Sequence, residues 1–319
     1  MMRNRNLKDK YIDATVVMGT YNGELFLKKQ IESILCQTLI PKEILVVDDG
    51  STDNTRKILK EYAKNTDIEF RLIFRKKNIG YIKNFIDGIN RSRYDLIFLS
   101  DQDDEWLPKK VEYTVGFFDR VPDCVVLHSN TNIIDSQGCI ISKNAQKYIK
   151  SKKISMTTLL KKVNYPGMAL ALRKSAIISK LNQWCLDNIE LPTHDWTICF
   201  LGVINNGFYI TPEVLTLRRF TGNNVALKLE RPLLLSGTEN RINGIVLYEK
   251  YYNLVNDVQN KYNTYYINIQ GYLQNAKLRK TYLGNYSFHL WQKNFRNILY
   301  YPSIKSYFTD GILISKWKK

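Results

Sequence analysis

A run of acidic and amide side chains near residue 100 has the composition of a divalent-cation site. Asp101-Gln102-Asp103-Asp104 follows the apolar segment Leu96 to Leu99 directly, so several carboxylates lie at the end of an expected strand. Mg²⁺ and Mn²⁺ prefer oxygen ligands, and Mg²⁺ typically takes one or two protein carboxylates and leaves its other positions to water and phosphates. The run therefore predicts a metal site beside a phosphorylated ligand. The alternative is a solvated acidic turn that caps a helix beginning near Trp106.

Three further polar clusters follow apolar, strand-like runs earlier in the chain. Gly19 to Asn22 follows Ala14 to Met18, Asp48 to Ser51 follows Glu43 to Val47, and Asn78 to Gly80 follows Phe70 to Phe74. In parallel sheets, ligands bind beyond the carboxyl ends of the strands. We therefore expect four consecutive strand ends to converge on one crevice.

Helix-like segments separate these strands. Apolar residues recur at helical spacing from Phe26 to Leu35, Ser51-Thr52-Asp53 can cap a helix that runs to about Lys64, and another helix is expected from about Tyr81 to Arg91. Strands that alternate with helices of about 10 to 15 residues indicate βαβ crossovers. The first half of the chain is therefore predicted to be α/β with a mostly parallel sheet.

The chain changes character after about residue 225. From about 125 to 220, strands are expected at Val125 to Leu127, at Gly167 to Leu172 and before Arg218, with a helix that starts near Thr193. Residues 226–319 contain 14 Lys and Arg, 5 Asp and Glu, and 12 of the 21 Tyr, with the Leu, Ile and Tyr periodicity of helices. We predict two domains: an α/β domain at 1–225 and a basic, Tyr-rich helical region at 226–319.

Five sequence landmarks occur in the order found in one known enzyme family. They are Val16 to Gly23 (VVMGTYNG), Ser33 to Thr38 (SILCQT), Val46 to Asp53 (VVDDGSTD), Asn78 to Gly80 (NIG) and Ser100 to Pro108 (SDQDDEWLP). On these motifs, residues 13 to about 225 resemble family 2 glycosyltransferases of the GT-A fold. The acidic run ending in Trp106, with the later His194-Asp195-Trp196, resembles the bacterial rhamnosyltransferase-like group that builds surface polysaccharides.

The resemblance implies a fold, a reaction and a cofactor. The GT-A fold is α/β, with a Rossmann-like, mostly parallel sheet flanked by helices, here followed by a C-terminal helical appendage. The reaction is transfer of a hexosyl or rhamnosyl group, with inversion, from a UDP-, dTDP- or GDP-sugar to a hydroxyl of a growing, lipid-linked surface polysaccharide such as capsule, O-antigen or cell-wall glycan. Asp103, assisted by Asp101, would hold Mg²⁺ or Mn²⁺ on the donor diphosphate, where the metal offsets charge on the departing nucleotide.

The same resemblance implies which residues contact the donor. Tyr21 would lie against the base, and Asp49 would accept a hydrogen bond from a base N–H. The other implied donor contacts are Thr20, Asn22, Glu24, Asn78, Gly80, Asp101, Gln102, Asp103, His194, Trp196, Arg218 and Arg219. As alternatives, Tyr21 is an ordinary turn aromatic and Asp49 a helix cap.

Inverting transfer also needs a base that takes the proton from the acceptor hydroxyl, and Asp195 is the candidate. It lies in the opening turn of the helix expected after Pro192-Thr193, where the helix dipole favours the carboxylate form. An ionised carboxylate is ready to accept a proton. The alternative is that Asp195 only caps this helix, with His194 and Trp196 as packing residues.

One stretch departs from the family pattern. The family often has an Arg-x-His-like element followed by Asn and Val after the last core strand, whereas this chain has Arg218-Arg219-Phe220-Thr221 and then Asn223-Asn224-Val225. Bidentate pairing of Arg218 or Arg219 with phosphate is still expected. The missing His puts closure of this loop over the diphosphate in doubt.

The formal net charge of +17 is compatible with a nucleic acid, an anionic membrane or a phosphorylated substrate as partner. A biased base composition of the genome is an alternative explanation of this charge. In residues 226–319, Lys and Arg together with Trp291, Tyr300, Tyr301 and Trp317 suit an anionic lipid headgroup region. The alternative is a helical dimerisation element with an aromatic core. Because residues 1–13 lack the apolar stretch of a secretory signal, we expect a cytoplasmic protein, with peripheral contact to the inner membrane face left open.

Three other functions compete with this interpretation. A nucleic-acid-binding protein would explain the charge, but no RRM-like or helix-turn-helix signature occurs and acidic clusters follow the strands. A catalytically inactive partner subunit of the same fold is disfavoured by intact Asp103 and Asp195. A nucleotidyltransferase would need a Gly-rich phosphate loop, which the sequence does not contain.

Overall fold

The computed structural model describes residues 10–220 and 237–315, which fold as two compact units. The first, here called the sheet unit, contains residues 10–154, 165–184 and 193–220. The second, the helical unit, contains 155–164, 185–192 and 237–315. The domain boundary expected at 225/226 lies outside the described residues.

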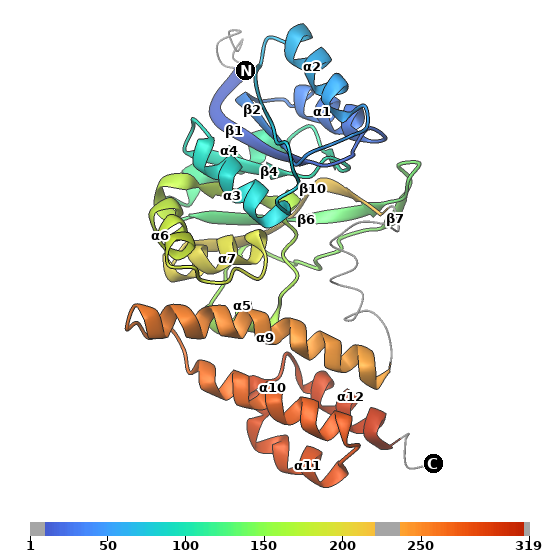
Figure 1. Ribbon diagram of the computed structural model, residues 1–319, viewed down its shortest axis with the longest axis vertical. Coiled ribbons are helices and arrows are strands. Elements are labelled where there is room, and N and C mark those ends of the chain that lie inside the picture. Colours follow the sequence, from blue (N-terminus) through green and yellow to red (C-terminus); the bar gives the residue numbers. More distant parts are fainter. Residues whose placement is uncertain (1–9, 221–236, 316–319) are drawn as a thin grey trace. The chain divides into compact units, whose positions relative to one another are not determined.

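Ten strands of the described residues form one sheet, and eight of them follow the order β3-β2-β1-β4-β9-β6-β10-β5 (Figure 1). Strand β7 pairs with β6, and β8 pairs with β10. The strand bounds are β1 (Tyr11–Thr20), β2 (Ile40–Asp48), β3 (Glu69–Phe74), β4 (Leu96–Ser100), β5 (Glu105–Trp106), β6 (Val126–Ile134), β7 (Ile140–Ser142), β8 (Lys152–Lys153), β9 (Leu170–Arg173) and β10 (Phe208–Arg219).

The predicted parallel arrangement is confirmed for the first four strands. Strands β3, β2, β1 and β4 are all parallel neighbours, and β6 and β10 also run parallel. Strand β9 runs antiparallel to both of its neighbours, β4 and β6. The segment expected to be a strand over Gly167 to Leu172 opens with a 3₁₀ turn, η2 (Gly167–Ala169), and only then enters β9.

Helices cover both faces of the sheet. Helices α1 (Leu27–Leu35), α2 (Thr55–Asn65) and α4 (Lys110–Arg120) share one apolar core with β1, β2 and β4. Helix α3 (Tyr81–Arg91) packs on β1 and β2 from the other face, and α7 (His194–Ile204) packs on β6 and β10. Helix α6 (Lys174–Leu186) follows β9. The helix expected from about residue 106 begins later, at Lys110, because Trp106 pairs with β10 as part of β5.

Helix α3 approaches the sheet closely at one glycine. A Cβ on Gly88 would lie 2.5 Å from Val17 Cγ1 and 3.3 Å from Val47 Cγ2. Only glycine leaves room for this packing, since a protein interior at crystal-like density cannot absorb an added methyl group without shifts. The close approach holds the C-terminal half of α3 against β1 and β2.

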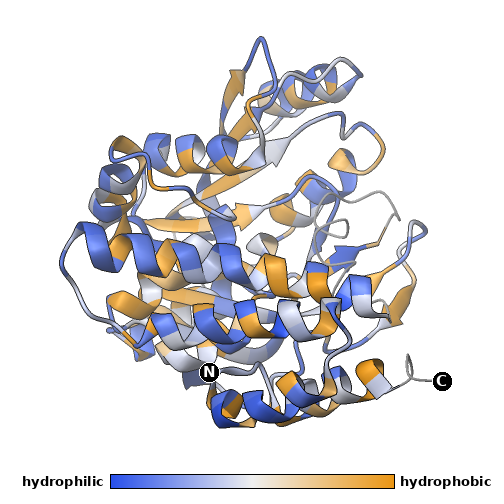
Figure 2. Cartoon of the chain, turned by 60° about the horizontal axis from the view of Figure 1, so that its bottom comes forward, coloured by the Kyte–Doolittle hydropathy of each residue, from blue (hydrophilic) through white to orange (hydrophobic). Residues whose placement is uncertain are grey.

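The helical unit consists of amphipathic helices joined by short connections. The elements are α5 (Met156–Lys161), α9 (Thr238–Lys261), α10 (Ile269–Gly284), α11 (Phe288–Lys293), η3 (Asn294–Tyr300) and α12 (Ile304–Ser315). Figure 2 shows hydrophobic and hydrophilic residues alternating around these helices. The predicted helices of the C-terminal region are therefore confirmed. Over 10–220 and 237–315, no helix is both long enough and apolar enough to cross a membrane.

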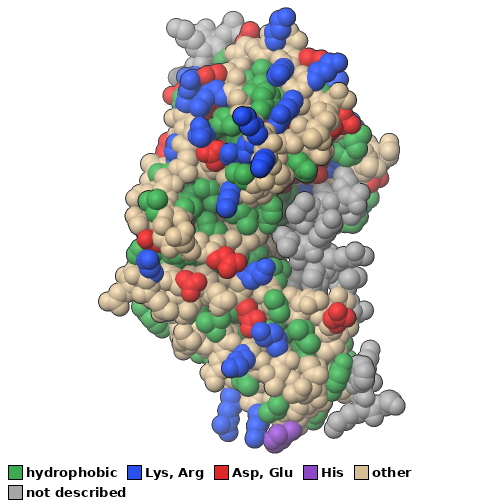
Figure 3. Space-filling model, viewed as in Figure 1, with side chains coloured by type: hydrophobic (Ala, Val, Ile, Leu, Met, Phe, Trp, Pro, Cys, Tyr) green, Lys and Arg blue, Asp and Glu red, His purple; other side chains and the backbone are tan. Residues whose placement is uncertain are grey.

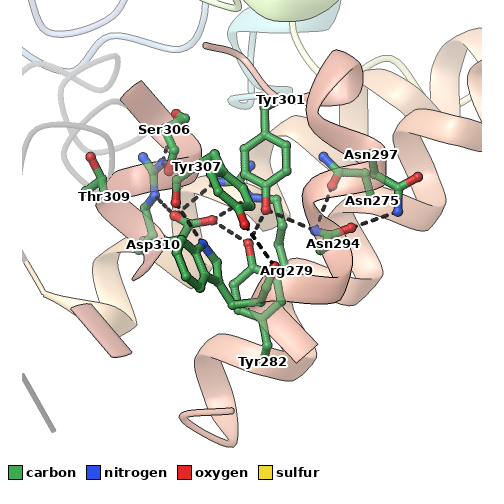
Figure 4. A network of polar contacts seen from close by, with 12 residues as sticks. Asn275, Arg279, Tyr282, Asn294, Asn297, Tyr301, Ser306, Tyr307, Thr309 and Asp310 are labelled. Carbon is green, nitrogen blue, oxygen red and sulfur yellow. Dashed lines mark hydrogen bonds and ion pairs between the residues drawn. The ribbon is translucent and has the colours of Figure 1, made fainter. Parts of the chain in front are cut away.

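A buried polar network holds α9, α10 and α12 together (Figure 4). Asp310 is fully buried and accepts hydrogen bonds from Arg241 Nε at 2.7 Å, Arg279 Nε at 2.9 Å and the Tyr282 hydroxyl at 2.7 Å. Burial alone would raise the Asp310 pKa, but Arg279 and its other partners outweigh burial and lower it. Every oxygen of this carboxylate has a charged or hydroxyl donor.

Several aromatic residues of the helical unit pack inside it. Tyr301 is 1% exposed and hydrogen-bonds Tyr282, Trp291 stacks on Tyr307 with ring centroids 4.7 Å apart, and Tyr300 packs edge-on against Tyr272. The expectation that Tyr301 lies at a lipid headgroup region is therefore wrong, because its ring fills the core. Trp317 lies outside the described residues.

Candidate active site

The carboxyl ends of β1, β2 and β3 are tied to one another by hydrogen bonds. The Asp49 N–H donates to Thr20 O at 2.8 Å, the Thr20 hydroxyl donates to Asp48 Oδ1 at 3.0 Å, and the Arg75 N–H donates to Asp48 O at 2.9 Å. Neighbouring parallel strands place their ends at the same sheet edge, so these loops meet there. The predicted convergence of strand ends is confirmed.

Tyr21 and Gln102 lock the loop after β1 to the loop after β4. The Tyr21 N–H donates to Gln102 Oε1 at 2.8 Å, and Gln102 Nε2 donates to Tyr21 O at 3.0 Å. A Cβ on Gly23 would overlap the Gln102 carboxamide, so glycine is required beside the lock. The side chain of Gln102 therefore acts through the Tyr21 backbone and leaves the Tyr21 ring 48% exposed at the site.

The two aspartates that end β2 have different surroundings. Asp48 is fully buried and accepts from Ser51 and from Arg56 Nε at 2.7 Å, which makes it a structural carboxylate. Asp49 accepts the backbone N–H groups of Ile79 at 2.8 Å and Gly80 at 2.9 Å. Asp49 thus positions the loop after β3, whose Gly80 has φ +89°, a conformation that favours glycine.

The acidic loop after β4 contains three aspartates, Asp101, Asp103 and Asp104. Burial and the neighbouring Asp103 raise the pKa of Asp101 to about 7, and burial with Asp103 and Asp101 raises the pKa of Asp104 well above its usual range. Burial also raises the pKa of Asp103. Titratable groups whose pKa is shifted by burial and by neighbouring charge mark functional sites.

Basic residues from other elements face this loop. The Lys110 ammonium donates to Met168 O at 2.6 Å and to Thr216 Oγ1 at 2.9 Å, and burial lowers its pKa to about 7. The charge of Arg218 acts to lower the pKa of Asp101, Asp103 and Asp104. Lys110 went unnoticed in the sequence because a lysine after Pro108 in an expected helix gives no sign of burial.

Arg219 is committed to protein contacts. It is 1% exposed and donates to the backbone oxygens of Asp103 at 3.0 Å and Asp135 at 2.8 Å, pairs with Glu105, and lies over the Phe26 ring. The guanidinium therefore links β10 to the acidic loop. Of the two arginines expected to contact phosphate, Arg219 therefore has a guanidinium that is already held by protein groups.

Asp195 lies at the start of α7, as predicted. The Thr193 hydroxyl caps this helix by accepting the Trp196 N–H at 3.3 Å, and Asp195 Oδ1 accepts the same N–H at 2.7 Å. The Asp195 charge contributes to the raised pKa of Asp101 and helps burial raise the pKa of Tyr81 to about 12. The structure therefore brings Asp195 together with the acidic loop, although 91 residues of sequence separate it from Asp104.

The side chain of His194, the residue before Asp195, is buried and packed against aromatic residues of α3. It is 5% exposed, stacks on Phe85 with centroids 4.2 Å apart, and meets Tyr81 edge-on at 5.7 Å. Burial lowers its pKa, which favours the neutral imidazole. Neither ring nitrogen has a hydrogen-bond partner among the described residues. Tyr81 and Phe85, one turn apart on α3, were missed because helical aromatics are usually core residues.

Other residues implied to contact the donor have protein partners. Glu24 accepts the Asn54 backbone N–H at 2.9 Å, and Asn22 Oδ1 accepts the Thr52 N–H at 2.9 Å. Asn78 Oδ1 accepts the Gly80 N–H at 3.0 Å, and Trp196 is 1% exposed. These side chains shape the loops around the crevice, so donor contact through them would use their backbone or their remaining lone pairs.

The carboxylate oxygens of the acidic loop are suitable ligands for a divalent cation. In residues 10–220 and 237–315, no three His, Cys, Asp or Glu side chains are arranged as a protein cage for a metal. Such a cage is unnecessary for Mg²⁺ held between a protein and phosphates, which uses one or two carboxylates. Asp101 and Asp103 supply carboxylates close enough for Asp103 to raise the pKa of Asp101. A bound cation would offset that repulsion.

Comparison with known proteins assigns the family. A model of glycosyl transferase family 2 matches residues 15–178, which include the strand-end loops and the acidic loop. This chain belongs to family 2. The resemblance seen in the sequence motifs is thereby confirmed.

Individual relatives match different portions of the chain. An uncharacterized protein of Mycobacterium tuberculosis is 33% identical over 126 residues, which are 39% of this chain and 36% of that protein. The chain thus matches only about a third of that relative's length. The dTDP-rhamnosyl transferase RfbG of Shigella flexneri is 28% identical over 218 residues, 65% of this chain and 72% of that protein.

Solved structures support the fold. The crystal structure of S. aureus TarS residues 1–349 in complex with UDP-GlcNAc has a TM-score of 0.57 and 14% identity, covering 96% of this chain and 92% of that one. The shared architecture confirms the predicted GT-A fold with C-terminal helices.

Proposed function

We propose that this protein is an inverting glycosyltransferase that moves a sugar from a nucleotide-diphosphate sugar to a hydroxyl of a growing, lipid-linked surface polysaccharide. One observation carries the proposal: Asp195 of α7 lies close enough to Asp101 to affect its pKa, so a carboxylate from a separate element faces the acidic loop. Family 2 membership supports the reaction class.

The residues divide into a donor side and an acceptor side. On the donor side, the exposed Tyr21 ring lies against the base, Asp49 holds the 79–80 loop beside it, and Arg218 pairs with the diphosphate. Asp101 and Asp103 would hold Mg²⁺ or Mn²⁺, which would neutralise charge on the departing nucleotide. On the acceptor side, Asp195 accepts the proton of the attacking hydroxyl.

The packing of α7 supports this role for Asp195. Stacking of His194 on Phe85 and the cap from Thr193 fix the first turn of the helix. A base held by packing needs little reorganisation when the acceptor arrives.

Replacement of Asp195 by Asn tests the base. We expect Asp195→Asn to lower sugar transfer about a thousandfold, within the range of general-base catalysis, and to keep donor affinity within a few fold. Transfer is measured with a labelled donor, and affinity by calorimetry. Glu239→Gln, which changes an exposed first-turn carboxylate of α9, is the control and keeps full transfer. Retained turnover in Asp195→Asn would exclude the base assignment.

Replacement of Asp103 by Asn tests the metal. With Mn²⁺ present, we expect Asp103→Asn to weaken donor binding about tenfold or more, because it removes one carboxylate ligand. Without metal, the variant and the unmodified protein should bind the donor equally weakly. Asp123→Asn, at an exposed carboxylate elsewhere in the sheet unit, is the control. Equal metal dependence in both proteins would contradict the assignment.

The donor nucleotide is the next question. The rhamnosyl relative favours a dTDP-sugar and the TarS structure a UDP-sugar, so thermal-shift screening of UDP-, dTDP- and GDP-sugars with Mn²⁺ separates them. A lipid-linked acceptor would place the enzyme at the inner face of the cell membrane. A protein that binds a donor but neither transfers nor hydrolyses it would instead be an inactive partner subunit.

A further inference from the structure

Helix α12 presents an apolar stripe to solvent. Ile304, Phe308 and Ile312 are spaced four residues apart, so they lie on one face of the helix. Their side chains are 64%, 53% and 55% exposed. A different face, formed by Tyr307, Asp310, Gly311 and Ile314, is buried in the helical unit. The stripe is therefore not needed for packing this helix within its own unit.

The neighbouring η3 extends the stripe. Phe295 and Leu299 are 55% and 73% exposed, and the Phe295 ring lies 5.6 Å from that of Tyr307, which in turn contacts Phe308. We call these five exposed residues, Phe295, Leu299, Ile304, Phe308 and Ile312, the α12–η3 surface. Gathered exposed apolar side chains of this size mark interaction sites more often than isolated ones do.

The chain segment that carries the α12–η3 surface is mostly basic. Residues 258–315 contain 7 Lys and Arg and a single acidic residue, Asp310. Asp310 is fully buried and paired with Arg241 and Arg279, so no carboxylate side chain of this stretch reaches water. Lys293, Arg296 and Lys305 are exposed beside the apolar residues. Figure 3 shows Lys and Arg without Asp or Glu over α11, at the lower end of the view.

We propose that the α12–η3 surface docks on an anionic lipid bilayer. Its apolar side chains would enter the boundary between headgroups and acyl chains, and Lys293, Arg296 and Lys305 would lie at the negatively charged headgroups, as in interfacial amphipathic helices. The charge argues against a second copy as the occupant, because a symmetric dimer through this surface would bring the same basic residues together without carboxylates to pair them.

The inference deepens the proposed function and rests on it in one respect: a lipid-linked acceptor gives membrane docking its purpose. Docking itself depends only on the helical unit, whereas donor binding and Asp195 belong to the sheet unit. The two proposals can therefore fail separately.

Vesicle co-sedimentation of the full chain tests the surface. Vesicles of phosphatidylcholine alone are compared with vesicles of phosphatidylcholine and phosphatidylglycerol in equal parts. We expect strong binding to the anionic vesicles only, and a loss of about tenfold or more in partitioning for the double variant Phe308→Ser, Ile312→Ser. Lys305→Gln should weaken binding on the order of fivefold and reduce its salt dependence.

Matched variants separate docking from general effects. Ile149→Ser removes a 94% exposed apolar side chain from the sheet unit, and Lys64→Gln removes an exposed lysine from α2; both should bind vesicles like the unmodified protein. Circular dichroism confirms folding of each variant. Donor affinity, measured by calorimetry without lipid, should be unchanged in the α12 variants.

The outcomes are distinct. Equal binding to neutral and anionic vesicles, or unchanged binding in the Phe308→Ser, Ile312→Ser variant, would overturn the proposal. A dimer in light scattering that the same double variant dissociates, without vesicle binding, would assign the surface to a second copy instead. Vesicle binding that is retained in a protein without transfer activity would support docking while contradicting the proposed function.

Discussion

The sheet unit and the helical unit each bury carboxylates, but the pKa values of these groups are shifted in opposite directions. In the helical unit, Asp310 forms ion pairs with Arg241 and Arg279 and accepts a hydrogen bond from Tyr282. Its pKa is lowered. In the sheet unit, Asp101 and Asp104 lie beside Asp103, and burial and mutual repulsion raise their pKa values. Asp310 is held in its ionised form by its cationic and hydroxyl partners, whereas Asp101 and Asp104 are shifted towards the protonated, neutral form.

The difference separates a structural role from a functional one. A buried carboxylate with complete partners contributes to a specific fold, and breaking it leaves a buried charge uncompensated. Carboxylates that repel one another destabilise the chain unless a ligand, such as the proposed cation, binds between them. The direction of the pKa shift, more than burial alone, therefore distinguishes the Asp310 network from the candidate site.

The largest expected effect is loss of the Asp310 network. Asp310→Ala should cost about 3–5 kcal/mol of unfolding free energy in the helical unit, because Arg279 then stays buried without its carboxylate. Urea denaturation followed by circular dichroism measures the loss. Asp257→Ala, at an exposed position of α9, is the matched control and should change stability by less than about 0.5 kcal/mol. A similar small change in both variants would show that the network is not stabilising.

Acid should affect the same network in a defined direction. Because the folded pKa of Asp310 lies below its usual value of 3.8, its contribution to stability is present above about pH 4 and is lost as pH falls through the folded pKa. We expect the unfolding free energy of the unmodified protein to fall below about pH 4. In Asp310→Asn this part of the pH dependence should disappear, and identical acid profiles would contradict the assignment.

The smallest expected effect concerns the lock between Tyr21 and Gln102. Gln102→Ala removes two hydrogen bonds of about 1 kcal/mol each at a partly exposed position, so donor affinity should fall about fivefold to tenfold with little change in stability. Calorimetric titration with the preferred nucleotide measures this fall. Gln270→Ala, which removes one amide hydrogen bond in the helical unit, should leave affinity unchanged. Unaltered affinity in Gln102→Ala would mean that the lock does not shape the donor site.

Local sequence patterns predicted the elements that carry the site. Helix α3 spans the predicted Tyr81 to Arg91, and Asp195 occupies the first turn of α7 as expected, because caps and hydrophobic periodicity are local signals. The antiparallel direction of β9 was not predicted. The direction of a strand depends on its pairing, here with β4 and β6, rather than on its own residues. Likewise, no local signal distinguishes Arg218 from the buried Arg219.

The tyrosines of the helical unit show the same limit. Their number and spacing predicted helices but left a lipid-facing role for Tyr301 open, and the fold buries that ring beside Tyr282 and Asp310. Exposed apolar residues such as Phe308 lie only a few positions away. Whether an aromatic residue packs inside or faces outward depends on contacts between helices that are distant in sequence.

The sequence by itself determined the order of strands and helices, the family motifs and the basic character of the C-terminal region, because these follow from local periodicity, turn residues and composition. The tertiary structure decided which charges meet. It brought Asp195 to Asp101, committed Arg219 to backbone oxygens and enclosed Asp310 among its cations. The physical reason is that electrostatic interaction depends on distance and burial, and folding sets both for residues far apart in the chain.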